Sequence, residues 1–183
     1  DAMRFFAPEV ECILFPSWDG LPYDRIGPSP GVSAQRMAVL ARLQAGLKGD
    51  KPAILVAAAH AVLQRLPPAS ALERASYSAK PGADVVIADL ERYFAVNGYA
   101  RASTVSERGE FAIRGGVIDV FPPTAEEPVR LDLFGDSLES IRAFDPETQR
   151  STKQLHAVDL APVSEILLDA DATFALAQNS SVT

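Results

Sequence analysis

The sequence contains a single cysteine, Cys12, so it can form no internal disulfide bond. An unpaired cysteine suits a reducing compartment, and we therefore expect a cytoplasmic protein. Cys12 falls in a predicted buried strand, residues 11–15, where a packed thiol is favoured over a nucleophile. No apolar run approaches the roughly 20 residues that a membrane helix needs, and no secretory signal opens the sequence. Neither an integral membrane protein nor a secreted protein is expected.

Basic residues are also in deficit, with 17 Lys and Arg against 24 Asp and Glu and a formal net charge of −7. The deficit is largest in the middle of the chain, since residues 68–160 hold ten basic against fifteen acidic side chains, a balance of −5. Affinity for nucleic acid comes mainly from neutralising phosphates. A chain with this charge should bind DNA poorly by itself, which directs attention to a protein partner.

Histidine is scarce as well, with only His60 and His156. The two histidines are far apart in sequence, and no cysteine lies near either of them at the spacing of metal ligands. No metal site is therefore predicted. The GxxxxGK[ST] pattern of a phosphate-binding loop does not occur in the sequence. The strand predicted over residues 53–58 runs directly into a helix, as nucleotide-binding strands do, but the AAAHA junction has no glycine. We therefore predict no catalytic residues, no metal and no bound cofactor in this chain.

The first third of the chain has the pattern of a layered α/β unit. The continuous apolar run AILVAA is typical of a strand buried on both faces of a parallel sheet, and Ser33 is a suitable N-cap for the helix before it. The long loop preceding that helix contains Trp18 and Tyr23, which either stack on a ligand or pack the loop onto its own domain. The predicted elements are a strand at 11–15, a loop at 16–32, a helix from 33 to about 47, a strand at 53–58 and a helix at about 59–66.

The next unit is predicted to hold one helix and about five mostly antiparallel strands. Residues 69–80 are small and polar and predict a crossover or linker. Asp84 is the predicted cap of a helix that ends at Asn97-Gly98. After the meander of strands, residues 153–160 predict one last strand.

Within the meander, residues 129–134 alternate between apolar and other side chains. Arg130 and Phe134 therefore share the polar face of one strand, which is an unusual place for a large aromatic residue. Gly115-Gly116 separates two short β-rich runs and predicts a tight hairpin, which brings Arg114 within reach of that face if the register allows. The apolar spacing then slips from two to three over residues 138–144, which predicts a β-bulge or a bent strand.

The segments GEFAIRGGVIDVFPP (109–123) and EEPVRLDLFGDSLESIRAFDPETQRS (126–151) closely resemble the N-terminal region of the bacterial transcription-repair coupling factor (Mfd) family. The excision-repair protein UvrB has a looser version of the same pattern, and PSWDGLPYDRIGPSP and AILVAAAHAVLQRLPP are similar to the preceding domain of the family. The resemblance implies an α/β fold in which a partial parallel-sheet domain is interrupted by an inserted α+β domain with a mostly antiparallel sheet. The implied boundaries are 1–68 for a remnant of a UvrB-like domain 1a, 69–161 for the insertion, and 162–183 for the start of the return to the first domain as domain 1b, with a frayed tail.

The same resemblance implies a function. In that family the inserted domain docks UvrA, the damage-recognition ATPase, and the full-length protein uses ATP and Mg²⁺ and also engages RNA polymerase and DNA. The residues implied to contact UvrA are Arg114, Arg130 and Phe134. The chain itself would be a non-catalytic module that recruits UvrA, and the alternative is a UvrB-like, nucleotide-dependent fragment that processes damaged DNA.

A simpler interpretation of each of the three residues stays open at this point. Arg114 and Arg130 could form ordinary surface ion pairs with Glu110, Asp119 or Asp132, which contribute little to stability. Phe134 could be a core residue that a twist at the following glycine turns inward.

Overall fold

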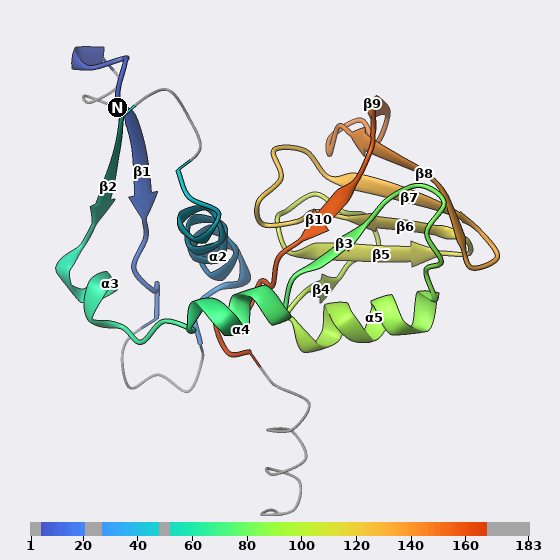
Figure 1. The fold of residues 1–183 in the computed structure, drawn as a ribbon, viewed down its shortest axis with the longest axis horizontal. Coiled ribbons are helices and arrows are strands. Elements are labelled where there is room, and N and C mark those ends of the chain that lie inside the picture. Colours follow the sequence, from blue (N-terminus) through green and yellow to red (C-terminus); the bar gives the residue numbers. More distant parts are fainter. Residues whose placement is uncertain (1–4, 21–26, 48–51, 168–183) are drawn as a thin grey trace, which may run out of the picture.

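A computed structural model of the chain describes residues 5–20, 27–47 and 52–167 (Figure 1). These residues form helices together with parallel and antiparallel sheets, so the chain is an α/β protein in the broad sense. Within the described ranges, no helix combines the length and the apolar content needed to cross a membrane.

The first α/β unit is built on two parallel strands. Strand β1 (Glu11–Phe15) pairs with β2 (Ala53–Ala57) in the predicted positions. Helix α2 (Pro30–Gln44) contacts β1 and lies between this pair and the larger sheet in Figure 1. The short helix α3 (Ala59–Leu63) follows β2 directly, as predicted, but ends three residues early.

Helix α2 begins earlier than the sequence predicted, because Ser29 rather than Ser33 is its N-cap. The Ser29 hydroxyl accepts the Val32 backbone N–H, and Pro30 occupies the first helical position, where a missing N–H costs nothing. Ser33 is buried inside the first turn. The helix stops at Gln44, and Gly46 follows with a φ of +75°.

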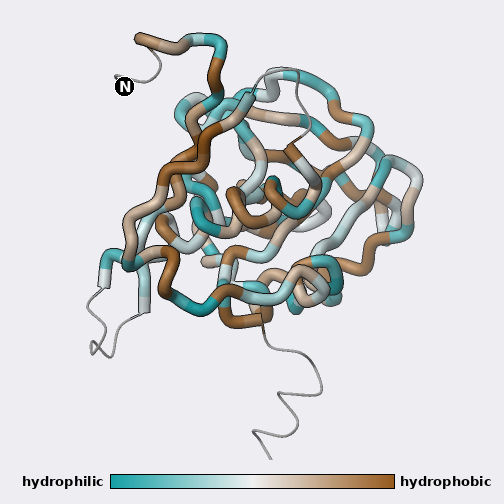
Figure 2. Tube along the Cα trace, turned by 60° about the vertical axis from the view of Figure 1, so that its left-hand side comes forward, coloured by the Kyte–Doolittle hydropathy of each residue, from teal (hydrophilic) through white to brown (hydrophobic). Residues whose placement is uncertain are grey.

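The prediction that β2 is buried on both faces is wrong for this chain. Ile54, Leu55 and Val56 each keep more than two-fifths of their surface exposed, because β1 is the only strand that pairs with β2 among the described residues. Figure 2 turns this side of the molecule forward and shows the hydrophobic stretches of chain that run along it. Cys12 is correspondingly half-buried rather than buried.

Residues 69–80 are not a plain linker. They form helix α4 (Ala69–Arg74) and strand β3 (Tyr77–Ala79), which pairs antiparallel with β10 (Val158–Leu160). The single strand predicted over 153–160 is accordingly two strands in two sheets, since β9 (Ser151–Leu155) pairs with β8 instead.

The largest sheet has six strands in the order β4-β5-β6-β7-β8-β9. All neighbours are antiparallel except β4 and β5, which confirms the predicted mostly antiparallel meander. The strands not yet bounded are β4 (Ala100–Arg101), β5 (Glu110–Arg114), β6 (Val117–Val120), β7 (Val129–Phe134) and β8 (Ser137–Phe144).

Turns within this sheet follow the sequence closely. Arg114 pairs with Val117 across a two-residue turn in which Gly115 has a φ of +59°, so the predicted hairpin is confirmed. The predicted bulge is also present, because Asp132 pairs with Ser140 while the next residue of β7 pairs with Leu138, which leaves one residue of β8 without a partner on β7.

Helix α5 (Ile87–Val96) covers one face of the six-stranded sheet. Leu90 and Phe94 are buried on its inner side, and Phe94 stacks on Phe111 of β5 at 4.6 Å between ring centroids. Asp84 does not cap this helix, because it forms a bridge with Ser137 and the N-cap position belongs to Val86. The helix ends at the predicted place, with Asn97 as its C-cap.

Candidate docking surface

The second face of the six-stranded sheet holds two of the three predicted site residues, Arg114 and Arg130. Strand register puts Asp119 of β6 opposite Arg130 of β7, and Arg130 opposite Arg142 of β8. One row further along, Val117 lies between Arg114 and Asp132. The side chains of α5 and their buried partners occupy the opposite face. Arg114 and Arg130 are therefore on one side of the sheet, as the parity of the sequence requires.

A single buried carboxylate joins the two arginines. Asp119 has no exposed surface, and its Oδ1 and Oδ2 accept hydrogen bonds from Arg130 Nε at 2.6 Å and Arg130 Nη2 at 2.9 Å. Arg114 Nη2 also donates to Asp119 Oδ2. Ion pairing with Asp119 is thus real, but the pairs converge on a buried group and are not independent surface contacts.

Arg130 is held on more than one side. Its guanidinium lies 4.8 Å from the centre of the Phe144 ring, its Nη1 donates to the Gln149 carbonyl at 3.5 Å, and its side chain is only 19% exposed. The hydrogen bonds to Asp119 raise the pKa of Arg130, while burial acts in the opposite direction. Truncation of Arg130 would leave Asp119 buried without its main donor, so we expect it to lower the stability of the domain.

Arg114 and Phe134 are the accessible members of the three. The Arg114 side chain is 50% exposed, and Phe134 is 78% exposed at the end of β7. Phe134 is therefore not a core residue. Arg114 is separated from β7 by one strand, a lateral distance of about 10 Å at the usual spacing. Leu133 donates its backbone N–H to Gly116 at 2.8 Å, which fastens the hairpin turn beside the exposed aromatic.

Sequence reasoning missed the second charged group on this face. Arg142 donates to Asp132 Oδ2 through Nη2 at 2.7 Å and Nε at 3.1 Å, and Ser140 donates to the same oxygen at 2.6 Å. The signal was present in the alternation of β8, where Ser140 and Arg142 have the same parity. The bulge at the start of β8 hides this alternation from a count made along the whole segment.

The far end of the same face is closed. Four buried apolar side chains form a small core there: Val105, Ala112, Phe121 and Phe144. Gln149 donates to the Val105 carbonyl at 3.1 Å and to the Pro146 carbonyl at 2.7 Å, which ties the β8–β9 connection over this core. Away from this core, Arg114 and Phe134 are the exposed predicted site residues.

Other candidate residues do not gather into a site. Trp18 donates its Nε1–H to Glu165 at 2.9 Å, which favours packing over ligand stacking, while Tyr23 lies outside the described residues. His60 and His156 are exposed and far apart in sequence. No group of three or more His, Cys, Asp or Glu able to hold a metal ion occurs among the residues that the structure describes.

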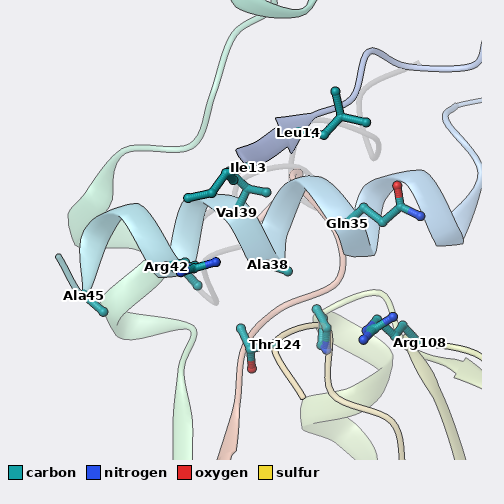
Figure 3. A pocket seen from close by; sticks show the side chains of 11 residues that line it. Ile13, Leu14, Gln35, Ala38, Val39, Arg42, Ala45, Arg108 and Thr124 are labelled. Atoms are coloured by element: carbon teal, nitrogen blue, oxygen red, sulfur yellow. The ribbon is translucent and has the colours of Figure 1, made fainter. Parts of the chain in front are cut away.

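A separate groove lies elsewhere, between the first unit and the sheet. Figure 3 shows this groove of about 630 Å³, with Gln35, Ala38 and Arg42 of α2 above it and Arg108 and Thr124 below. Both of its arginines are engaged, since Arg42 pairs with Glu11 and Arg108 donates to the Ala125 carbonyl at 3.1 Å. None of the three predicted site residues lines it.

The sequence of the chain is similar to that of known proteins. Residues 78–166 match the family model of the UvrB interaction domain. The chain is 35% identical over 156 residues to a transcription-repair-coupling factor of Haemophilus influenzae, covering 85% of this chain and 13% of that protein. Over 162 residues it is 35% identical to the Myxococcus xanthus protein of that name (88% and 13%), and over 152 residues 32% identical to the Escherichia coli one (83% and 13%). The chain spans about an eighth of the length of these relatives. Through residues 78–166 it belongs to the UvrB interaction domain family, within a segment similar to one in transcription-repair-coupling factors.

Proposed function

We propose that this chain is the module of a transcription-repair coupling factor that recruits UvrA to DNA on which RNA polymerase has stalled at damage. The observation that carries the proposal is the open sheet face with Arg114 and Arg130 around a buried carboxylate and an exposed Phe134. The family of residues 78–166 and the relatives' names support it. In this proposal the module acts in the cytoplasm, while RNA polymerase and DNA are bound by other parts of the longer protein.

The chemistry of the face suits a protein partner. Guanidinium groups pair bidentately with carboxylates, and a rigid strand holds them in a fixed direction. Arginine and large aromatic residues dominate binding hot spots because they bury much area around directed hydrogen bonds. We therefore propose that UvrA presents an acidic group to Arg114 and Arg130 and an apolar pocket to Phe134.

We also propose the domain architecture that the resemblance implied: an α/β domain from 1–68, an inserted docking domain from 69–161, and a segment from 162–183 that begins the return to the first domain. Contacts across the chain support this arrangement. Glu165, which follows the last strand, accepts hydrogen bonds from Arg36 of α2 and from Trp18. Residues after the sheet therefore pack on residues before it.

The direct test is binding of purified UvrA to single-alanine variants, measured by calorimetry. Arg114→Ala and Phe134→Ala should each weaken binding tenfold or more, at about 1.4 kcal/mol per decade. Both side chains are at least half exposed, so the melting temperature should change little. Arg92→Ala, an exposed arginine on the helix that covers the other face, is the matched control and should bind as the unchanged chain does.

Arg130→Ala requires its own folding control. It should weaken binding by a similar factor but also lower stability by about 1–3 kcal/mol, since a buried carboxylate loses two donors. UvrA binding that is unaffected by both Arg114→Ala and Phe134→Ala would refute this surface as the docking site.

The chain itself is proposed to be non-catalytic, without bound ATP or Mg²⁺. Phosphoryl transfer needs a phosphate cradle, a lysine and a metal-holding carboxylate in set positions, and the sequence contains no phosphate-loop pattern. Purified chain should release no phosphate from ATP above the buffer rate. Turnover that disappears on mutating one of the chain's own residues would instead favour a UvrB-like nucleotide-dependent role.

A further inference from the structure

We infer that Asp119 is the positioning residue of the docking surface: it holds the guanidinium groups of Arg114 and Arg130 in the arrangement that a partner's acidic group recognises. The inference rests on the proposed function, and it concerns a residue that is itself inaccessible to any partner. Asp119 has no exposed surface. It can influence docking only through the two arginines that it contacts.

The first line of argument is geometric. Asp119 is on the central strand of the group, with Arg130 directly opposite on β7 and Arg114 reaching over from the end of β5. Its two carboxylate oxygens accept hydrogen bonds from three guanidinium nitrogens, two from Arg130 and one from Arg114. A single buried group therefore fixes the spacing between the two positive charges.

The second line is entropic. A free arginine side chain has many rotamers, and ordering it on binding is unfavourable. Side chains already held in place before the partner arrives avoid much of that cost. Arg130 is also held by the Phe144 ring and the Gln149 carbonyl, whereas Arg114 is half exposed and has, besides Asp119, one long hydrogen bond from Nη1 to the Ser103 carbonyl at 3.4 Å. We therefore expect loss of Asp119 to act mainly through Arg114.

The third line is electrostatic. Two guanidinium groups and one carboxylate give this cluster a formal charge of +1, so the domain can keep two arginines side by side without their full repulsion. The cluster consequently suits a partner that supplies one further carboxylate. An unscreened pair of positive charges would suit a more acidic partner and would spread apart.

The test is Asp119→Asn in the full 183-residue chain, with purified UvrA as the binding probe. Asparagine keeps the size of the side chain but removes the charge, and its NH₂ group faces a guanidinium donor. UvrA binding should weaken about tenfold or more. Asp132→Asn is the matched control, because it removes the other aspartate of the same face, which pairs with Arg142 instead, and it should have less than half the effect.

A double-mutant cycle separates positioning from a general structural effect. If Asp119 acts through Arg114, then Asp119→Asn should weaken binding much less in an Arg114→Ala background than in the unchanged chain. A general loosening of the sheet would give the same loss in both backgrounds, and that result would overturn the inference. If Arg114→Ala and Phe134→Ala both leave binding unchanged, the proposed docking surface fails instead. If only Arg114→Ala leaves binding unchanged, the inference about Asp119 is overturned while the surface stands.

A second pair of variants covers the case in which Asp119→Asn does not fold, as judged by near-ultraviolet circular dichroism. Arg130→Gln with Asp119→Asn places two neutral amides that can hydrogen-bond each other where the ion pair was. Compared with Arg130→Gln alone, the double variant should bind UvrA at least threefold more weakly, because Arg114 has lost the charged carboxylate that positions it. Equal binding of these two variants would overturn the inference.

Discussion

Replacing Arg36 with methionine should destabilise the protein strongly, because this arginine is fully buried. Its Nε and Nη2 donate to the two carboxylate oxygens of Glu165 at 2.5 and 3.1 Å, and its Nη1 donates to the Pro16 carbonyl at 2.7 Å. The guanidinium also lies 4.2 Å from the centre of the Phe15 ring. Methionine keeps most of the aliphatic contact and removes every one of these donors.

The expected cost follows from the burial of both partners. Glu165 is only 6% exposed, so it would be left as a buried charge without its main partner, which typically costs about 3–5 kcal/mol. Arg36→Met combined with Glu165→Leu should recover most of that loss, since a buried ion pair replaced by apolar groups is often nearly neutral. Arg101→Met is the control, because the Arg101–Glu91 pair is 60% and 42% exposed and should cost less than about 1 kcal/mol.

Urea unfolding followed by circular dichroism would give the free energies, and hydrogen exchange in α2 would show whether the first unit loosens alone. A coupling energy of about 2 kcal/mol or more between Arg36 and Glu165 is expected. The reasoning would be refuted if Arg36→Met cost less than 1 kcal/mol. It would also be refuted if the double variant lost as much stability as the two single variants together.

Three further predictions concern pH, the hairpin and DNA. Burial raises the pKa of Tyr93 and of Tyr99 above the ordinary value of 10. The unfolded chain loses these protons first, so the stability that the two tyrosines contribute, measured by urea unfolding, should be constant below about pH 10 and then fall, by up to about 1.4 kcal/mol per pH unit for each tyrosine. Gly116→Ala should cost about 1–3 kcal/mol in thermal unfolding, because a Cβ there would lie 2.6 Å from the Leu133 carbonyl oxygen, whereas Gly115→Asn, in open space at a φ that asparagine tolerates, should be nearly neutral. With a net charge of −7, the chain should bind undamaged duplex DNA only weakly at physiological salt. A submicromolar dissociation constant in a fluorescence anisotropy titration would contradict this and would indicate an overlooked basic face.

Local patterns in the sequence were sufficient to predict much of the central sheet. Side chains alternate between faces with a period of two wherever a strand forms, so the shared face of Arg130 and Phe134 follows from their spacing alone. The turn at Gly115-Gly116 is equally local, because its backbone angles depend on those two residues. The bulge in β8 was visible in the slip of its apolar spacing.

Local patterns were misleading where distant segments decide the outcome. The apolar run of β2 predicted full burial, yet burial depends on how many strands pair with it, and the described residues supply one. Residues 77–79 form a strand only because residues 158–160 lie beside them, some eighty positions later. Small polar residues without hydrophobic periodicity do not indicate which distant strand they will pair with.

Tertiary structure alone decided the environment of the charged groups. The residue types show that Asp119 could pair with an arginine, but its complete burial and its place between two guanidinium groups depend on the order β5-β6-β7 in the sheet. Arg36 and Glu165 are 129 positions apart, and neither has a local feature that predicts the other. Hydrophobic periodicity is a property of neighbouring residues, whereas the partner of a buried charge is set by which surfaces the folded chain brings together.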